Sequence, residues 1–306
     1  MTLPTIAAVE AGGTKFVISV CRGDQLGKSI TVPTSDPETT LSSAVAFIET
    51  ELRGGSLDAV GIASFGPVDV DSESMSFGAI CATPKLGWTG VNLRKYFHST
   101  FNCPVNIESD VNGAALAEAT WDIERPINHL AYVTVGTGIG VGIVHGGLIS
   151  NGTSHPEIGH IRVPKRKDDS SFAGVCPFHG DCIEGLASGP AVFERWQATL
   201  SDLDQDHIAH DIEAFYLGQL AANIALHHRP EVIIFGGGVS QTSGLIPRIR
   251  KECQSALGGY LPDPDSSDAM ASLIQQPRLG TDSGIRGALM LGQTALGAHT
   301  AHSYPI

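Results

Sequence analysis

Short runs of apolar and β-branched residues recur along the chain, and most of them are bounded by glycine. Such runs predict buried strands, here Thr5–Val9, Phe16–Val20, Ala59–Ala63, Val105–Ile107, His129–Val135, Ile139–Val144 and Val232–Phe235. Other segments place apolar residues at helical spacing and predict helices, here Thr40–Leu52, Asn112–Trp121, Ala191–Leu200, Ile208–His227 and Ser283–Leu296. Strands that alternate with helices indicate an α/β fold.

The same order of elements begins twice along the chain. A strand pair joined at Gly12 and Gly13 opens the first half, and a pair joined within residues 136–140 opens the second. At about 150 residues per domain, the 306 residues also favour two domains. We expect an N-terminal α/β domain over residues 1–115 and a C-terminal α/β domain over residues 116–279. Residues 262–268 are expected to form a polar surface loop, and residues 298–306 to fray.

Charge and composition exclude several classes of protein. The formal net charge is −13 at pH 7, which repels a phosphate backbone and argues against nucleic-acid and anionic-membrane partners. We find neither an N-terminal secretion signal nor a run of about 18 apolar residues, so we expect a cytoplasmic protein that does not enter a membrane. In a reducing compartment the six cysteines are expected to be free thiols or metal ligands.

Three glycine clusters are candidates for binding a nucleotide. The first, Gly12-Gly13-Thr14-Lys15, directly follows an apolar strand, so its backbone N–H groups can approach phosphate oxygens with no Cβ in the way. This cluster matches neither a Walker A nor a Rossmann fingerprint. Taken alone, it fits a plain hairpin turn equally well.

The other two clusters lie in the second half of the chain. Thr137 and Gly138 lie between two predicted strands, and Gly236-Gly237-Gly238 follows the strand Val232–Phe235. The carboxyl end of a strand is where α/β sheets usually bind ligands. Clusters in both halves therefore suggest one nucleotide, ATP, held between them.

Asp110 is the candidate catalytic residue. The segment Asn106–Gly113 delivers it from a predicted strand into a turn that opens a helix of small residues. A kinase that acts on an alcohol needs a carboxylate beside the attacking hydroxyl, while Mg²⁺ and N–H donors hold the charge of the phosphoryl group. An Asp at this position is also suited to serve as the N-cap of the helix.

A metal-binding pattern lies in the second half of the chain. Cys176, His179 and Cys182 form a C-x2-H-x2-C sequence, and His160 lies upstream. Four nitrogen and sulfur donors match a closed, tetrahedral Zn²⁺ site. The alternative is a disulfide between the two cysteines. A closed site leaves no position for water or phosphate, so the metal is expected to organise its loop.

Polar side chains near this pattern are candidates for binding a sugar. Glu157, His160 and Glu184 supply the carboxylate and imidazole groups that pair with sugar hydroxyls, although either glutamate also fits an ordinary surface charge. The turn Gly66-Pro67 forms either the rim of a sugar pocket or a plain loop. Trp88, in a later turn, is a candidate apolar wall of that pocket.

These motifs together resemble the ROK family of repressors, uncharacterised reading frames and sugar kinases. The resemblance rests on Glu10–Lys15, Glu108–Asn112, Gly136–Gly140, Glu157–His160 and Cys182–Glu184. It extends from about residue 5 to residue 297 and implies a two-domain, actin-like and hexokinase-like ATPase fold, with the active site in the interdomain cleft. It also implies that a helix within residues 280–306 completes the first domain.

The resemblance also implies roles for single residues. Asp110 would be the general base for a hexose bound with ATP-Mg²⁺, and Glu157, His160 and Glu184 would bind sugar hydroxyls. Ser109 would lie beside the sugar, at a position where glucokinase-like members usually carry Asn. A structural zinc and, commonly, a homodimer complete this expectation.

Particular substitutions narrow the predicted substrate. Ser109, and His179 in place of a cysteine, weaken a glucose assignment, whereas Glu10 and the long segment Gly174–Pro190 resemble bacterial ROK fructokinases. We therefore predict phosphorylation of D-fructose to D-fructose 6-phosphate, ahead of glucose, mannose or N-acetylmannosamine. A family repressor would need a basic helix-turn-helix ahead of Glu10, for which there is no room. The third alternative is a non-catalytic module that binds zinc or a sugar. In such a module the glycine clusters would be only turns.

Overall fold

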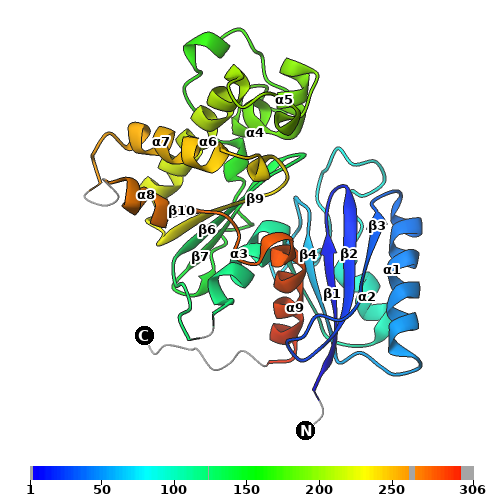
Figure 1. The fold of residues 1–306 in the computed structure, drawn as a ribbon. Coiled ribbons are helices and arrows are strands. Elements are labelled where there is room, and N and C mark those ends of the chain that lie inside the picture. The colour runs from blue at the N-terminus through cyan, green and yellow to red at the C-terminus, as the bar shows by residue number, and fades with distance from the viewer. Residues whose placement is uncertain (1–2, 123, 262–265, 298–306) are drawn as a thin grey trace. The chain divides into compact units, whose positions relative to one another are not determined.

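The computed structural model describes residues 3–122, 124–261 and 266–297 (Figure 1). The chain divides into two compact units, the first formed by Met1–Glu118, Ser150–His155 and Asp282–Ile306 and the second by Ala119–Ile149 and Pro156–Thr281. The segment Ser150–His155 is an excursion of the chain from the second unit into the first. It lies outside residues 1–115, which the sequence predicted as the first domain. Residues 262–265 of the expected polar loop, and the tail 298–306, lie outside the described residues, whereas Ser267 begins helix α8 (Ser267–Leu273).

The first unit is built on a five-stranded sheet in the order β3-β2-β1-β4-β5. Its strands are β1 (Thr5–Ala11), β2 (Lys15–Arg22), β3 (Ser29–Pro33), β4 (Ala59–Ser64) and β5 (Val105–Ser109). β1 pairs antiparallel with β2 and parallel with β4, which pairs parallel with β5. The register places Ala11, Ser64 and Ser109 in one row. The segments that follow β1, β4 and β5 therefore leave the sheet at the same edge.

Helices cover both faces of this sheet. Alternate strand residues such as Val9 and Ile62 share a core with helices α1 (Pro37–Leu52) and α2 (Leu93–Phe101). Helix α9 (Ser283–Ala295) packs on β1 and β4 from the other side (Figure 1). This contact requires glycine, because a Cβ on Gly61 would lie 1.9 Å from the carbonyl oxygen of Ala288. The backbone of α9 can therefore lie directly on the strand that leads to the Gly66-Pro67 turn.

The second unit repeats the same arrangement of strands. Its sheet has the order β10-β9-β6-β7-β8, with β6 (Leu130–Val135), β7 (Ile139–His145), β8 (Leu148–Ile149), β9 (Val232–Gly236) and β10 (Ile274–Gln275). The pairs β6–β7 and β7–β8 are antiparallel, and the pairs β6–β9 and β9–β10 are parallel. Both sheets thus follow one plan, as the two similar openings in the sequence predict.

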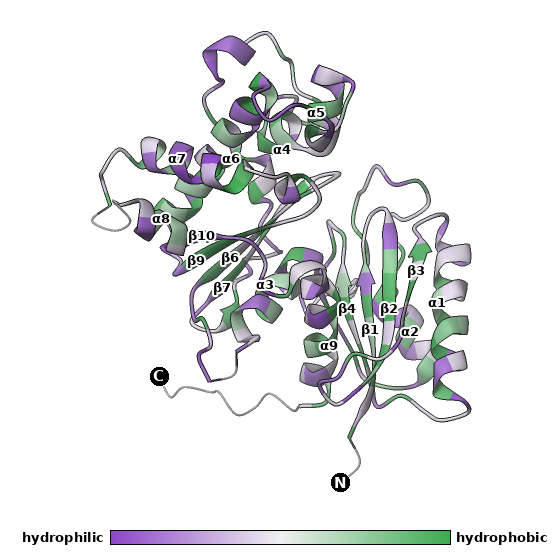
Figure 2. Cartoon of the chain, viewed as in Figure 1, coloured by the Kyte–Doolittle hydropathy of each residue, from purple (hydrophilic) through white to green (hydrophobic). Residues whose placement is uncertain are grey.

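An apolar core holds the described residues of the second unit together. It joins the sheet to helices α4 (Ile183–Ala187), α5 (Gly189–Trp196), α6 (Ile208–His228) and α7 (Leu245–Leu257). Figure 2 shows β6 and β9 as apolar along most of their length, as expected for strands that are buried on both faces. Within the residues that the structure describes, no helix has the length and apolarity needed to cross a lipid bilayer.

The predicted strands and helices are all present among the described residues, with ends that differ by a few positions. The sequence did not predict β3, β8, β10, α2, α4, α7 and α8. β3 is a mostly exposed edge strand and α4 has five residues, so neither carries a clear hydrophobic period. Trp88, the candidate wall of a sugar pocket, is fully buried and packs on Phe16 and Phe65 with ring centroids 5.5 Å apart, so its position is explained by the core of the first unit.

Candidate active site and metal centre

The first sheet brings three of the predicted segments together at its carboxyl edge. The row formed by Ala11, Ser64 and Ser109 is followed by the glycine turn, by the Gly66-Pro67 turn and by Asp110. The N–H of Phe65 donates to the carbonyl oxygen of Ala11 at 2.6 Å, so the first two of these segments begin in direct contact. This edge is the usual ligand-binding edge of a sheet with parallel strands.

The first glycine cluster forms the tight turn between β1 and β2. The N–H of Gly12 donates to the carbonyl oxygen of Lys15 at 3.0 Å, and a Cβ on Gly12 would lie 2.7 Å from that oxygen. A Cβ on Gly13 would meet no atom within 4 Å, and Thr14 and Lys15 are exposed. The hairpin turn is confirmed, and Gly13 faces open space. Nucleotide binding at this turn stays a prediction.

Asp110 is the first residue of helix α3 (Asp110–Thr120) and is half-buried. Its Oδ1 accepts the N–H of Val111 at 2.9 Å. Burial raises the pKa of the Asp110 carboxyl from 3.8 to about 6, and the hydrogen bond from Val111 opposes part of that rise. The capping bond is made by Ser109 instead, whose hydroxyl accepts the N–H of Asn112 at 3.3 Å. The side chain of Asp110 is therefore not the N-cap of α3.

Ser109 is only 2% exposed, because its hydroxyl turns back onto the helix. Capping explains a serine at this position without a ligand. Contact between Ser109 and a sugar stays a prediction.

Glu10 lies in the electrostatic field of Asp110, and sequence reasoning gave it no chemical role. Burial and the negative charge of Asp110 raise the pKa of the Glu10 carboxyl to about 7, the charge of Lys15 lowers it, and Asp282 raises it further. A Cβ on Gly284, in the first turn of α9, would lie 2.4 Å from the carboxyl carbon of Glu10. The available signal was an acidic residue within an otherwise apolar buried strand.

A network of two amides and one carboxylate holds the junction between β5 and α3. Asn112 is fully buried, and its Nδ2 donates to Glu108 Oε2 and to Asn151 Oδ1, both at 2.9 Å. Asn151 Nδ2 donates to Glu108 Oε1 at 2.6 Å. Burial raises the pKa of the Glu108 carboxyl, and these hydrogen bonds oppose the rise. The network fixes Glu108 and Asn112, the residues on either side of the segment 109–111.

The excursion Ser150–His155 is tied to the first unit at both ends. Asn151 contacts the β5–α3 junction, and Nε2 of His155 accepts the N–H of Val68 at 3.2 Å. A Cβ on Gly66 would lie 3.1 Å from the ring of His155. The excursion thus supports both the strand before Asp110 and the turn that contains Gly66.

The second and third glycine clusters meet at one edge of the second sheet. Thr134 of β6 lies opposite Gly236 of β9. A Cβ on Gly237, whose φ is +84°, would lie 2.4 Å from the carbonyl oxygen of Val135. Only glycine allows the end of β9 to lie against β6 so closely. The neighbouring turn is closed by the N–H of Gly136, which donates to Gly138 at 2.9 Å.

The four predicted metal ligands converge in the second unit. The ligand atoms of His160, Cys176, His179 and Cys182 all lie within 4.8 Å of one another. His160 Nδ1 lies 3.5 Å from Cys182 Sγ and 3.7 Å from Cys176 Sγ, and His179 Nδ1 lies 3.7 Å from Cys176 Sγ. Tetrahedral zinc, with bonds of about 2.0 Å to nitrogen and 2.3 Å to sulfur, places neighbouring donors roughly 3.3–3.8 Å apart. The donor set therefore fits zinc, and both cysteines are free thiols and not a disulfide.

Backbone hydrogen bonds shape the metal loop. Cys176 and Gly180 exchange two N–H···O bonds at 3.2 and 2.9 Å, and Gly180 has a φ of +64° that favours glycine. A Cβ on Gly185 would lie 1.8 Å from the carbonyl oxygen of Gly180. Helix α4 can therefore pack directly on the loop that carries the ligands.

His160, one of the four candidate metal ligands, lies beside a candidate sugar-binding carboxylate. With Nδ1 of His160 among the metal ligands, its Nε2 lies 4.0 Å from Glu184 Oε1. Glu184 Oε2 accepts the N–H of Ile139 at 3.0 Å, directly after the second glycine cluster. Glu157 stands at the start of the turn that ends at His160, and its carbonyl accepts the N–H of His160 at 3.0 Å. His160 is thus joined to Glu157 through the backbone of one turn and lies beside the carboxylate of Glu184.

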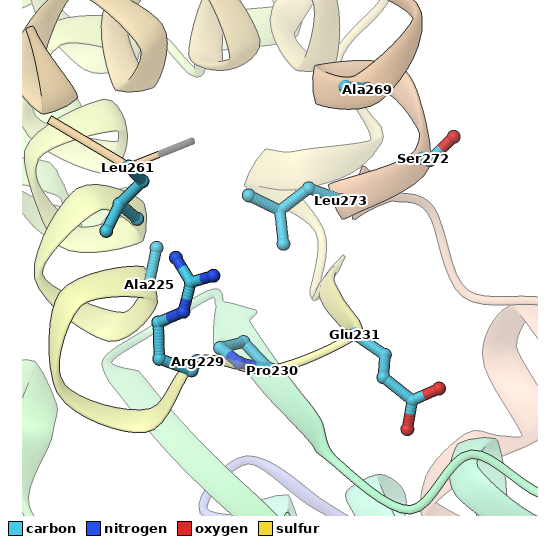
Figure 3. Close-up of a pocket in the computed structure, with 8 residues that line it drawn as sticks. All are labelled: Ala225, Arg229, Pro230, Glu231, Leu261, Ala269, Ser272 and Leu273. Atoms are coloured by element: carbon cyan, nitrogen blue, oxygen red, sulfur yellow. The ribbon is translucent and has the colours of Figure 1, made fainter. Parts of the chain in front are cut away.

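A pocket of about 400 Å³ lies elsewhere in the second unit, between the end of α6 and α8 (Figure 3). Its lining includes Arg229, Pro230, Glu231 and Leu273. Figure 3 shows the side chains of Arg229 and Glu231 pointing in different directions. None of the predicted site residues lines this pocket, so it takes no part in the candidate site.

The two sheets of equal strand order, with glycine turns at their carboxyl edges, define an actin-like, hexokinase-like ATPase fold. The sequence model of the ROK family matches residues 6–295, and the chain belongs to the ROK family.

Two bacterial fructokinases and one solved ROK structure are similar to nearly the whole chain. It is 38% identical to a fructokinase of Zymomonas mobilis over 94% of this chain and 96% of that protein. It is 36% identical to a fructokinase of Pediococcus pentosaceus over 95% of this chain and 98% of that protein. Among solved structures, a ROK family glucokinase of Streptomyces griseus, in complex with glucose and AMPPNP, has a TM-score of 0.75 at 26% identity and covers 95% of this chain and 99% of its own.

Proposed function

We propose that this chain is an ATP-dependent fructokinase that transfers the γ-phosphoryl group of ATP to D-fructose and yields D-fructose 6-phosphate. The observation that carries the reaction type is the position of Asp110. This half-buried carboxylate lies at the edge of the sheet where β1 ends and the first glycine turn begins. The similarity to the fructokinases of Zymomonas mobilis and Pediococcus pentosaceus supports the choice of sugar.

Asp110 acts on the attacking hydroxyl in this proposal. Its pKa of about 6 keeps it ionised at neutral pH yet basic enough to accept a hydroxyl proton as the oxygen bonds to phosphorus. The N–H of Val111 holds Oδ1 and so orients the carboxylate. Most of the rate in such a transfer comes from positioning and from stabilisation of the phosphoryl charge.

The nucleotide is bound by the three glycine turns. Their N–H groups suit phosphate oxygens, and we assign this role to Gly12, Gly13, Thr14, Lys15, Thr137, Gly138, Gly236, Gly237 and Gly238. Mg²⁺ enters with ATP and offsets the charge of the phosphates. Glu10, the half-buried carboxyl two residues before the first glycine turn, is a candidate to hold this cation.

Zinc binding by His160, Cys176, His179 and Cys182 is the second part of the proposal. His160 would hold zinc through Nδ1 and would then carry its ring proton on Nε2, so that the imidazole would be a fixed donor beside Glu184. The closed site would orient groups that bind the hexose and would offer no open coordination position. The proposed sugar contacts are Glu157, His160 and Glu184 in the second unit and Ser109, Gly66 and Pro67 in the first.

A panel of sugars tests the proposed activity. Purified protein with ATP and Mg²⁺ should release ADP fastest with D-fructose, and more slowly with glucose, mannose and N-acetylmannosamine. A coupled ADP assay measures the rates, and omission of Mg²⁺ or of sugar is the control. Faster turnover of another hexose would replace the substrate, whereas no sugar-dependent ADP release would reject the kinase.

A further inference from the structure

The second unit contains a buried ionic cluster that the proposed chemistry does not use. Nε and Nη2 of Arg195, on α5, donate to the two carboxylate oxygens of Asp169 at 2.9 and 2.8 Å. The hydroxyl of Tyr216, on α6, donates to Asp169 Oδ2 at 2.8 Å. The side chains of Arg195 and Asp169 are 5% and 6% exposed. The guanidinium also lies 3.7 Å from the ring centroid of Phe172.

Stability alone does not explain such a pair. Desolvation of two charges offsets much of their attraction, and apolar replacement of both partners is often neutral or stabilising. Loss of one partner is costly, because the other charge stays buried and unpaired. A buried, bidentate pair is better explained by the geometry that it fixes, since both oxygens and two guanidinium nitrogens must align.

Arg195 joins the two segments that carry the zinc ligands. Asp169 lies in the chain between the ligands His160 and Cys176. Nη1 of Arg195 donates to the carbonyl oxygen of Leu186 at 2.6 Å. Leu186 belongs to α4, the helix whose N-cap is the ligand Cys182. One guanidinium therefore binds both the loop and α4.

Tyr216 and Glu213, both on α6, complete the surroundings of the pair. The hydroxyl of Tyr216 also accepts the backbone N–H of Arg166 at 3.4 Å, so a second point of the loop is held on α6. Glu213 is 1% exposed, and burial raises the pKa of its carboxyl well above the usual value, with Arg195 opposing the rise and Asp169 adding to it. Asp169, whose two carboxylate oxygens both accept from the guanidinium, is the charge that pairs with Arg195.

We infer that Arg195 and Asp169 are positioning residues for the zinc loop. Their pair sets the distance between the loop and α4, and so the geometry in which His160, Cys176 and Cys182 meet. Through His160 and Glu184 it also sets the binding of the hexose, which is the part that rests on the proposed function. Zinc retention does not depend on that function and can be measured without any sugar.

The test compares zinc release from the wild type, Arg195→Met and the double variant Arg195→Met/Asp169→Leu. A matched control is Arg248→Met, which removes an arginine from a more exposed pair with Asp211 in the same unit. Transfer of zinc to a chromogenic chelator should be at least about 10-fold faster in both test variants, the scale expected when a group that supports a ligand is lost. Arg248→Met should release zinc at the wild-type rate.

The double variant separates positioning from stability. Because it leaves no buried unpaired charge, its melting temperature should stay close to that of the wild type while its zinc release stays fast. Both variants should also show a raised KM for fructose and a nearly unchanged KM for ATP. Wild-type zinc release from the double variant would overturn the inference, as would a wild-type protein purified without zinc. If the wild type holds zinc but phosphorylates no hexose, the proposed kinase activity is rejected. The rates of zinc release from the variants then still test the positioning role of Arg195 and Asp169.

Discussion

Asp110→Asn should lower kcat with fructose by at least about 100-fold, the lower bound for loss of a general base. The amide keeps the size and hydrogen-bonding shape of the side chain but cannot accept the hydroxyl proton. Steady-state ADP release at saturating fructose and ATP-Mg²⁺ measures the effect. Asp24→Asn, an exposed change in the same unit, is the control and should keep the wild-type rate. A near wild-type rate in Asp110→Asn would remove the assigned role.

The same variant should be more stable than the wild type. Because burial raises the pKa of Asp110 from 3.8 to about 6, the folded state binds more protons than the unfolded state between these values, and stability falls as pH rises through that window. At neutral pH the ionised carboxylate then costs roughly 1–3 kcal/mol, which a neutral amide avoids. Thermal unfolding at pH 7.5 should show a raised melting temperature. A lowered melting temperature would contradict this electrostatic account.

Cys182→Ser should remove the zinc and most of the affinity for sugar. Zinc content should fall from about one per chain to near zero, because a hydroxyl is a poor replacement for a thiolate in a closed site. The KM for fructose should rise by at least about 10-fold, whereas the KM for ATP should change little, because the metal orients His160 beside Glu184. Elemental analysis and two-substrate kinetics measure the two effects.

Two controls accompany the zinc experiment. Cys253→Ala removes another buried thiol of the second unit, on α7, and should keep its zinc. Removal of zinc from the wild type with a chelator, followed by addition of zinc, should lower and then restore fructose binding, which separates metal loss from misfolding of the variant. Full zinc content in Cys182→Ser, or unchanged fructose kinetics after zinc removal, would contradict the proposed metal site.

The sequence predicted those parts of the site that depend on short segments of chain. The glycine turns follow strands directly, so their positions at the sheet edges followed from strand direction once the strands were identified. Glycine was informative where a Cβ cannot fit, as at Gly12 beside Lys15 and at Gly237 beside Val135. The candidate zinc ligands Cys176, His179 and Cys182 are close in sequence, so their spacing alone indicated a metal.

Features that depend on the packing of distant segments were missed. The pair Arg195–Asp169 joins residues 26 positions apart, and Asn112 and Asn151 are 39 apart, so no local pattern connects them. Ser109 was assigned only to a sugar because sequence spacing does not show which way its hydroxyl turns. Glu10 took its significance from Asp110 and Asp282, which only the folded first unit brings into its electrostatic field.

The pH dependence of kcat/KM for fructose tests the role of Asp110 most directly. As the pH is lowered below an apparent pKa between about 6 and 7, the wild-type kcat/KM should fall about tenfold per pH unit. This apparent pKa belongs to the interacting carboxyls of Asp110 and Glu10 together. In Asp110→Asn the residual activity should be low and should lose the dependence that protonation of residue 110 causes. An unchanged acidic limb at near wild-type activity in that variant would show that another group accepts the proton.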